Sequence, residues 1–490
     1  MSIIIIGAGF GGLSAAIRLA AAGKEVLLLE ASGSAGGKAG EITVDGLSSD
    51  TGPSVLTMAE EAIELLQLAD DADLVQFRTP SPGFRYLYAD GTVLDVHHEL
   101  QQTTDNIRSV LGDTTAKEFE NFMHYSKQIW DGSAPHFIHG EAPNWLSILR
   151  LAITHPMLIP KMDPLRSMRS SIRRQITSPH LRMLMERYAT YNGSDPRQAP
   201  ATLNCIAHVE LALGGYGVNG GIKSLVNALT TVAEKLGVQF RYNQAVQRIE
   251  VQSGSVCAVV TQAGERIPCT HIVANADAAQ IAKHLLGRSV NHGIKCPTPY
   301  SMSGWTGVIK AKRNPEIERV AHTVLFPSDY NQEFADIFDR NQPPDDPTVY
   351  ICSQSECHNR PGTEEHQALF VMVNAPPEPE DGATSFDVWK RVENTVLKRL
   401  HDNHLLTEGD HLIWTRSPTQ LAEQFPGSRG AIYGAASNNR FAAFQRPANR
   451  IASVSGLYLA SGSAHPGGGM PLAMISGKAA SQALLADISQ

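Results

Sequence analysis

A glycine-rich turn near the start of the chain has the residue types and spacing to hold a phosphate group. Residues 3–6 are four isoleucines, typical of a strand buried on both faces, and the sequence GAGFGG follows at residues 7–12. Gly7 permits a tight turn, Gly9 lets the backbone approach a pyrophosphate, and Gly12 lets the next helix pack against the strand. The residues predicted to form this dinucleotide-binding turn are Gly7, Gly9, Phe10, Gly11 and Gly12.

An acidic residue follows at the spacing that a dinucleotide-binding unit requires. The turn leads into an alanine-rich helix over residues 13–22, and residues 26–29 form a second buried strand. Glu30 ends that strand and can accept hydrogen bonds from a ribose hydroxyl pair. Because its carboxylate would repel a 2′-phosphate, the pattern predicts a Rossmann-type site and disfavours NADP.

Two further segments favour FAD over NAD as the dinucleotide. The adjacent glycines at residues 36–37 can form a second anion-binding nest, and the lysine after them adds positive charge. The sequence DTGPS at residues 50–54 is expected to turn past the flavin end of the cofactor. The cofactor-binding residues assigned to these segments are Gly36, Gly37, Lys38, Pro53 and Ser54.

A second glycine-rich junction lies near the C-terminus. A short strand over residues 456–460 leads into SGSAHPGGGMP at residues 461–471, and a helix is expected over residues 472–485. The N-terminus of a helix aimed at a flavin ring would stabilise negative charge on the reduced ring. The residues assigned to this junction are Gly462, Ser463, Gly469, Met470 and Pro471.

Taken together, these segments resemble the bacterial-type phytoene desaturase family of FAD-dependent carotenoid desaturases. The resemblance covers nearly the whole chain and rests on IIIIGAGFGGLSAA, EASGSAGGKAG, DTGPSVLT, FPGSRGAIYG, FQRPANR and LYLASGSAHPGGGMPLAMISGKAA. It implies an α/β fold with a Rossmann-type FAD-binding domain of the flavin amine-oxidase and glutathione-reductase kind. It also implies that Val246 meets the adenine through its backbone.

Some middle segments resemble one subgroup, the hydroxyneurosporene and methoxyneurosporene C3–C4 desaturases. They are LRMLMERYATYNGSDPRQAPATL, GGYGVNGGIKSLVNAL and DPTVYICSQ. This resemblance implies that the protein introduces a C=C bond at C3–C4 of an acyclic 1-hydroxy or 1-methoxy carotenoid, by hydride transfer to flavin N5 and proton loss. The implied partner is a long apolar polyene held in a dry tunnel.

Alternative functions stay open at this point. A carotenoid isomerase or ketolase, or an oxidase of another polyene or of an amine, would keep the same fold. A flavin-binding or chromophore-binding protein without turnover is the third class. The sequence leaves the electron acceptor open between oxygen, a quinone and NAD.

No strong catalytic base can be identified from the sequence. The cation left by hydride loss would be delocalised over the polyene, so a strong base is not required. The weak candidates are His208, Glu210 and His465. His208 and Glu210 would share one face if their segment were a strand. Tyr188 and Tyr191 are further candidates for the pocket wall.

The pattern of elements predicts a discontinuous domain organisation. The FAD-binding domain is expected to comprise residues 1–70, 218–290 and 450–490. A mixed α+β substrate domain would comprise residues 71–217 and 291–449.

The segment over residues 144–187 is a candidate for a membrane-facing helical cap. It begins with a tryptophan and short apolar helices, and basic residues follow, as in proteins that lie on a membrane surface. These basic residues are Lys161, Arg166, Arg169, Arg173, Arg174, Arg182 and Arg187. The alternative is a helical cap whose arginines are only solvated.

Composition limits the remaining possibilities. The net charge of −8 argues against a nucleic-acid partner, and no apolar run reaches the length of a membrane span. The six cysteines include no C-x-x-C pair, so we expect no metal site and a reducing, cytoplasmic setting with peripheral membrane association.

Overall fold

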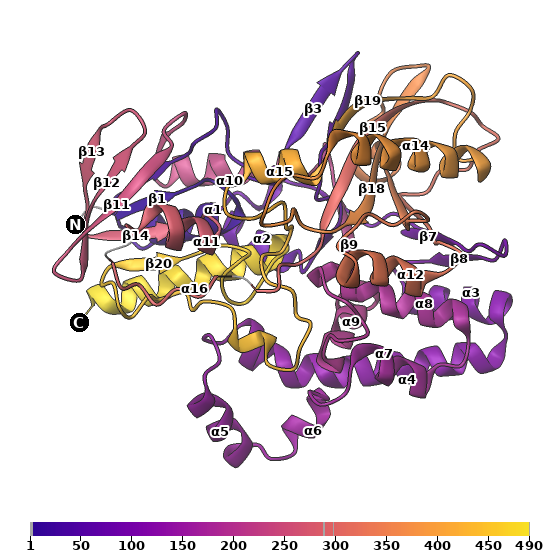
Figure 1. Cartoon of the computed structure of the whole chain (residues 1–490), viewed down its shortest axis with the longest axis horizontal. Coiled ribbons are helices and arrows are strands. Elements are labelled where there is room, and N and C mark those ends of the chain that lie inside the picture. The colour runs from indigo at the N-terminus through magenta and orange to yellow at the C-terminus, as the bar shows by residue number, and fades with distance from the viewer. Residues whose placement is uncertain (1–2, 288–289, 297, 490) are drawn as a thin grey trace.

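The computed structural model describes residues 3–287, 290–296 and 298–489. Its first large element is a parallel sheet in the order β10-β2-β1-β14-β20. The strands are β1 (Ile3–Ile6), β2 (Val26–Leu29), β10 (Gln239–Arg241), β14 (His271–Ala274) and β20 (Leu457–Leu459). The sheet thus joins three segments that lie far apart in the sequence, and both ends of the chain lie beside it (Figure 1).

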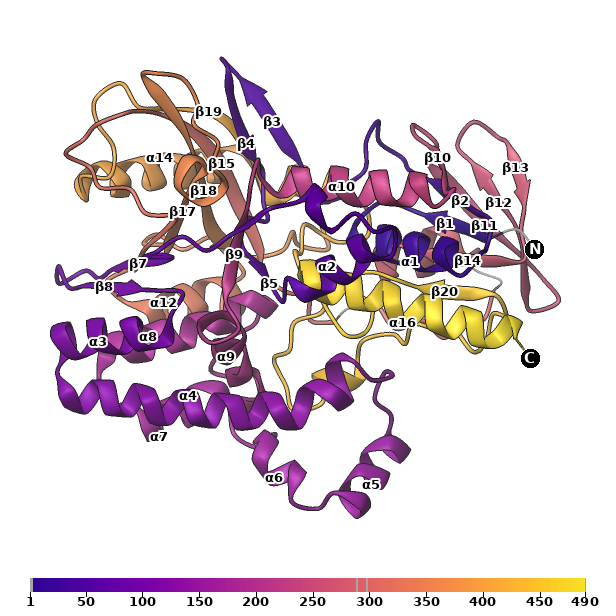
Figure 2. The ribbon, with the colours of Figure 1, turned by 180° about the vertical axis from the view of Figure 1, so that it is seen from behind.

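Helices pack against this parallel sheet. They are α1 (Phe10–Ala21), α2 (Glu60–Gln67), α10 (Ile222–Lys235), the short α11 (Ala278–Gln280) and α16 (Met470–Ile488). The first and last of the long helices lie side by side, as both views show (Figures 1 and 2). Their contact is close: Ser14 Oγ donates to the Met474 carbonyl at 2.7 Å.

The molecule also contains three small sheets. An antiparallel sheet contains β11 (Val246–Gln252), β12 (Ser255–Thr261) and β13 (Arg266–Pro268). A hairpin pairs β3 (Glu41–Val44) with β4 (Leu47–Asp50). The third sheet contains β5 (Leu56–Thr57), β9 (Gly215–Val218) and β6 (Phe77–Arg78).

A mixed seven-stranded sheet in the order β19-β15-β18-β17-β16-β7-β8 forms the second large element. Its strands are β7 (Phe84–Leu87), β8 (Val93–Val96), β15 (Ser303–Lys312), β16 (His322–Leu325), β17 (Val349–Ser353), β18 (His366–Ala375) and β19 (His411–Arg416). The helices of this region are α12 (Tyr330–Phe334), α13 (Gln354–His358), α14 (Phe386–Asp402) and α15 (Pro418–Gln424). Helix α14 buries Trp389, Val396 and Leu400 in one core with the sheet.

The third part of the molecule is helical. It contains α3 (Leu100–Leu111), α4 (Asp113–Ser133), α5 (Trp145–Thr154), α6 (Leu158–Met162), α7 (Met168–Gln175), α8 (Pro179–Arg187) and α9 (Cys205–Leu211). Most of these helices share one hydrophobic core with β7 and β8. Helices α5 and α6 instead project from the rest of the molecule (Figures 1 and 2).

The predicted α/β architecture is confirmed, but one local expectation is wrong. His208 and Glu210 lie on helix α9, not on a strand, so their side chains do not share a face. Among the described helices, none combines the length and hydropathy that crossing a bilayer requires.

Candidate cofactor and substrate site

A cavity of about 1220 Å³ lies between the parallel sheet and the seven-stranded sheet. It exceeds the ~300–1,000 Å³ of ordinary small-molecule pockets, so it has room for a dinucleotide and a second, long molecule. Its wall includes the two glycine-rich segments and, from the helical region, residues of α5 and α6. Nearly all sequence-predicted cofactor residues line it; the exception is Gly12.

The first glycine-rich turn forms the phosphate-facing part of the wall. Gly7 has a φ of 94°, a left-handed conformation that favours glycine, and the Gly9 N–H donates to Asn275 Oδ1 at 2.9 Å. No side chain caps helix α1, and its first turn contains no acidic residue. The N–H groups at its start therefore lie at the cavity wall without a side-chain cap, which fits a phosphate group.

Gly11 and Gly12 allow backbone segments to approach closely. A Cβ on Gly12 would lie 2.0 Å from the Gly7 carbonyl oxygen, and one on Gly11 would lie 2.2 Å from that of Ala460. Gly12 therefore acts through packing of helix against strand, as the sequence predicted, rather than by lining the cavity.

Glu30 lies in the cavity wall with its carboxylate already oriented. One oxygen accepts from the Ala8 N–H at 2.7 Å, and the other accepts from the Ser32 N–H and hydroxyl at 2.9 and 2.8 Å. These bonds tie the carboxylate to the glycine-rich turn. Because each carboxylate has about four acceptor positions, capacity remains for a ribose hydroxyl.

The expected second anion nest is only partly available. Gly36 and Gly37 line the cavity, but the Gly36 N–H donates to the Ala8 carbonyl at 2.9 Å. Lys38 also lines the cavity, yet its ammonium donates to the Ala431 and Ile432 carbonyls at 2.9 and 3.1 Å. Burial lowers the pKa of Lys38 to about 8. The expected lysine charge beside the nest is thus engaged with backbone carbonyls.

The remaining predicted cofactor residues also lie in the cavity wall. Pro53, Ser54 and Val246 all line the cavity, Val246 at the start of β11. The C-terminal residues Gly462, Ser463, Gly469, Met470 and Pro471 line it as well. Helix α16 has no side-chain cap and no acidic residue in its first turn, like α1. Two uncapped helix N-termini therefore meet the same cavity.

Two residues that the sequence did not single out hold these segments together. Asn275 accepts from the Gly9 N–H and donates to the Ala460 carbonyl, so it bridges both glycine-rich junctions. Arg446 is buried and donates to the Gly462 carbonyl at 3.0 Å and to the Ala435 carbonyl at 2.8 Å. Desolvation lowers its pKa to about 10. Two sequence signals could have pointed to them. Asn275 is the polar residue directly after β14, and Arg446 is the first arginine of FQRPANR.

The weak catalytic candidates do not line the cavity. His465 is buried, its Nε2 lies 3.0 Å from the Gly140 carbonyl oxygen, and desolvation lowers its pKa. Burial also lowers the pKa of His208. Glu210 accepts hydrogen bonds from the hydroxyls of Tyr188, at 2.9 Å, and Tyr191. Only Tyr191 of these groups reaches the cavity wall.

A buried arginine gives the apolar part of the cavity one cationic group. Arg187 lines the wall and donates to the hydroxyls of Tyr86 and Tyr191 at 3.1 and 3.3 Å. Its guanidinium also faces the rings of Phe84, Tyr86 and Tyr191. In the described part of the chain it forms no ion pair, so its charge is balanced only through the tyrosines and Glu210 behind them.

At its other extreme the cavity wall is exposed and apolar. Trp145 lines the cavity while 67% of it is exposed, and it stacks on Phe444 with ring centroids 4.9 Å apart. Leu165 also lines the cavity and is exposed. Further exposed apolar side chains on α5 and in the loop after it are Leu146, Leu149, Ile153 and Met157. The α5–α6 segment therefore forms an apolar rim at the mouth of the cavity.

The arginines of the same segment do not join this rim as expected. Arg187 is buried, and Arg166 pairs with Asp163 at 2.6 Å. Arg169 and Arg173 both pair with the buried Glu186. The expected basic, membrane-facing row is therefore not confirmed: internal carboxylates or the cavity wall hold these four, whereas Lys161 and Arg174 are exposed.

The parallel sheet, the two uncapped helix N-termini and the oriented acid define a dinucleotide-binding flavoprotein. Residues 10–485 match the family of flavin containing amine oxidoreductases, and the chain belongs to that family. It is thus an FAD-dependent oxidoreductase, and the cradle described above fits FAD.

Comparison with individual proteins is more specific than the match to the family. The chain is 34% identical to a hydroxyneurosporene desaturase of Rhodobacter capsulatus, over 99% of this chain and 98% of that protein. It is 30% identical to a 4,4'-diapolycopene oxygenase of a Methylomonas species, over 99% of this chain and 98% of that protein. Among solved structures, cyclohexylamine oxidase from Brevibacterium oxydans has a TM-score of 0.63 with 16% identity, covering 100% of this chain and 99% of that one.

Proposed function

We propose that the protein is an FAD-dependent carotenoid desaturase that forms the C3–C4 double bond of an acyclic 1-hydroxy or 1-methoxy carotenoid. The observation that carries this proposal is the cavity: apolar side chains line it beyond the cofactor cradle, and its buried wall contains Arg187 and Tyr191. Several relatives are named for this chemistry, including a 1-hydroxycarotenoid 3,4-desaturase. When bound, FAD supplies a hydride acceptor.

The chain's own residues act by positioning the polyene and excluding water. A buried guanidinium and a phenol in an otherwise apolar wall are hydrogen-bonding groups suited to a terminal hydroxyl or ether oxygen. Holding that end fixes which carbons of a long chain lie beside the cofactor. His208, Glu210 and His465 do not line the cavity, so none of them is proposed as the base.

We further assign cofactor binding to the residues that line the cradle, and the cradle to a domain formed by residues 1–70, 218–290 and 450–490. Support for this division comes from the parallel sheet, which takes all five strands from these ranges. The residues assigned to FAD binding, with Gly12 acting through packing, are Gly7, Gly9, Phe10, Gly11, Gly12, Glu30, Gly36, Gly37, Pro53, Ser54, Val246, Gly462, Ser463, Gly469, Met470 and Pro471.

We also propose that the α5–α6 rim rests on a lipid surface, so that an apolar substrate enters the cavity without crossing water. The support is the exposure of four large apolar residues of α5, Trp145, Leu146, Leu149 and Ile153, beside the cavity mouth. Since Arg166, Arg169 and Arg173 are paired, the rim is expected to bind mainly through apolar burial, with Arg150 and Lys161 as the exposed cations beside it.

The proposed reaction can be tested without oxygen. FAD-loaded protein is mixed with liposomes that contain an acyclic 1-hydroxy carotenoid, and the absorption of polyene and flavin is followed together. We expect a red shift of the polyene bands with stoichiometric bleaching of the flavin. Bound substrate with an unchanged polyene spectrum would contradict the proposal.

A variant pair tests the polar part of the cavity wall. Tyr191→Phe removes a hydroxyl in the wall, whereas Tyr188→Phe removes a similar bond to Glu210 away from it. A lost hydrogen bond to a substrate hydroxyl is worth about 0.5–1.5 kcal/mol. Only Tyr191→Phe should lower kcat/KM for the hydroxylated substrate relative to its deoxy analogue, by roughly 3- to 10-fold. Equal effects of both variants would contradict this assignment.

A further inference from the structure

A cluster of thiols and imidazoles lies in the interior behind the cavity wall. His322 lies on β16, Cys352 on β17 and Cys357 on α13, and all three side chains are buried. Their ligand-type atoms lie within 4.8 Å of one another, and His322 Nε2 is 3.5 Å from Cys357 Sγ. The fold therefore brings together two sulfurs and one nitrogen from two paired strands and the helix that follows the second of them.

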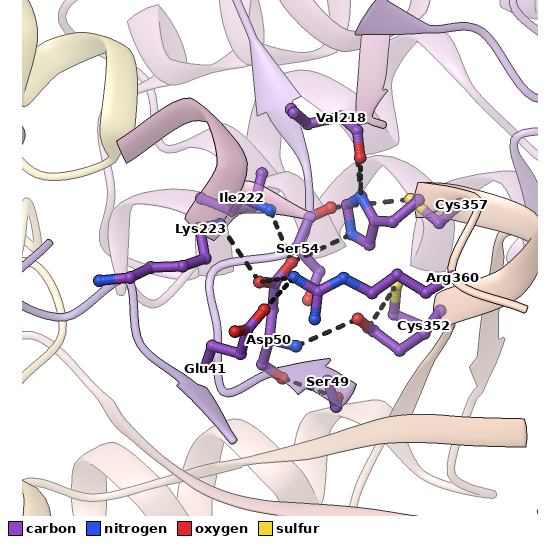
Figure 3. Close-up of polar contacts among 12 residues, drawn as sticks. Glu41, Ser49, Asp50, Ser54, Val218, Ile222, Lys223, Cys352, Cys357 and Arg360 are labelled. Carbon is purple, nitrogen blue, oxygen red and sulfur yellow. Dashed lines mark hydrogen bonds and ion pairs between the residues drawn. The ribbon is translucent and has the colours of Figure 1, made fainter. Parts of the chain in front are cut away.

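The surroundings of this cluster contain a polar group without a partner. His358 is fully buried, and its Nε2 has no hydrogen-bond partner in the described structure. That nitrogen lies 3.6 Å from a carboxylate oxygen of Asp50, which is also fully buried. Figure 3 shows the Arg360 side chain beside Asp50, with Cys352 and Cys357 nearby. Asp50 accepts from the Ile222 N–H at 2.7 Å and pairs with Arg360 at 3.4 Å, which leaves His358 Nε2 as a buried atom without a hydrogen bond.

Neighbouring side chains orient the donors as ligands. Tyr350 lies 2.8 Å from His322 Nδ1, which fixes the ring and leaves Nε2 toward the sulfurs. Metal-binding histidines have such a partner on the second ring nitrogen. Gln354 donates to Cys352 Sγ at 3.7 Å, a bond suited to a thiolate.

We propose that His322, Cys352 and Cys357 bind one thiophilic divalent cation, of which Zn²⁺ is the best match. Two sulfurs and an imidazole are its preferred ligands, and these described residues supply three of the four ligands of a tetrahedral site. Binding converts two thiols into thiolates and releases two protons to solvent. Two thiolates balance the charge of the dication, so the buried site has no net charge.

The position of the site indicates a structural role. Cys357 Sγ lies 3.9 Å from the Ser54 carbonyl oxygen, and Gln354 accepts from the Asp50 N–H at 3.1 Å. Ser54 and Tyr350 both line the cavity. The cation would therefore join β16, β17 and α13 to one another, next to the segment that passes the cofactor. The pattern escapes a search for C-x-x-C because the cysteines are five residues apart and the histidine comes from another strand.

Metal analysis of the FAD-loaded full chain tests the proposal. After dialysis against a weak chelator, we expect about one zinc per chain by mass spectrometry. Cys352→Ser and Cys357→Ser should each lose the zinc, and Cys269→Ser should keep it, because Cys269 is buried outside the cluster. Flavin-loaded wild-type protein without zinc, even after zinc supplementation, would overturn the proposal, as would variants that keep it.

A measurement on wild-type protein covers the case in which the variants do not fold. Protein produced with cobalt in place of zinc should show the d–d absorption of tetrahedral cobalt–thiolate at wavelengths beyond the flavin bands. A mercurial should release the metal as two thiols react. A spectrum without these bands, or thiols that react with no metal release, would refute the site. Neither readout depends on turnover, so the result is independent of the proposed reaction.

Discussion

The cofactor cradle and the α5–α6 rim line the same cavity, yet they are built on opposite principles. The cradle presents backbone: glycines bring the α1 and α16 N-termini to the wall, and Asn275 and Glu30 are tied to main-chain groups. The rim presents large apolar side chains with few partners. A phosphate is recognised by fixed N–H groups, whereas a lipid surface needs only exposed apolar area. The cradle should therefore tolerate almost no change in shape, and the rim almost no change in polarity.

The largest effect should come from filling the closest backbone contact of the cradle. In Gly12→Ala the new Cβ would lie 2.0 Å from the Gly7 carbonyl oxygen, so the helix must move away from the strand. We expect loss of bound flavin and a destabilisation of about 3 kcal/mol or more. Flavin content and thermal unfolding measure both effects. Gly33→Ala is the control, since its nearest heavy atom would be 3.7 Å away. A Gly12→Ala protein with full flavin content would contradict the account.

The second prediction changes the polarity of the rim and leaves the cradle residues unaltered. Leu146→Glu combined with Ile153→Glu places two charges on side chains that are 79% and 71% exposed. Losing the burial of two such side chains, about 3 kcal/mol, should weaken liposome binding roughly 100-fold. Stability and flavin content should not change. Phe386→Glu, at a 78% exposed position on α14, is the matched control and should bind liposomes like the wild type.

Lipid composition sharpens the same contrast. Because Arg166, Arg169 and Arg173 pair with internal carboxylates, only the exposed Arg150 and Lys161 of the rim should respond to anionic lipid and salt, so this dependence should be shallow. Co-sedimentation with zwitterionic and anionic liposomes measures this dependence. A steep salt dependence of binding would contradict this prediction and would support the basic membrane-facing surface that the sequence predicted.

The third prediction concerns the bridge between the two glycine-rich junctions. Asn275→Ala removes the acceptor of the Gly9 N–H and the donor to the Ala460 carbonyl. An unsatisfied buried group costs about 1–3 kcal/mol, so flavin affinity and melting temperature should both fall. The exposed Asn227 of α10 supplies the control, and Asn227→Ala should leave both unchanged. If Asn275→Ala and Asn227→Ala lowered flavin affinity and melting temperature to a similar extent, the bridging role of Asn275 would be contradicted.

The smallest effect should come from His465, a candidate base that the structure places outside the cavity. Its pKa is lowered by burial, so the unfolded chain binds a proton that the folded chain resists. Stability of the wild type should therefore fall as pH drops below about 6.5, and His465→Gln should lose the part of this dependence that His465 contributes, since burial also lowers the pKa values of His208 and His271. Denaturation at several pH values measures it. If His465→Gln lowered kcat by more than about 100-fold with stability unchanged, His465 would instead act in general acid–base catalysis.

The sequence predicted the cradle better than the rest because its signals are local. Four isoleucines, a glycine turn and an acid at fixed spacing specify one βαβ unit, and Gly12 packs as expected. Side-chain partners depend on tertiary contacts that no local pattern contains. For this reason the roles of Lys38, Asn275 and Arg187 could not be predicted, and residues 208–210 were too short a stretch to distinguish a strand from helix α9.

The bridge through Asn275 also sets the order in which the protein can mature. Helix α1 is synthesised long before β20 and α16, which complete its contacts. Until Ala460 is synthesised, Gly11 lacks its closest neighbour, and until α16 follows, the second uncapped helix is absent. Domains usually fold from the N-terminus during synthesis, but this cradle cannot close before α16 has emerged. Flavin uptake should therefore follow the synthesis of α16, and removal of α16 should leave a chain that cannot retain its cofactor.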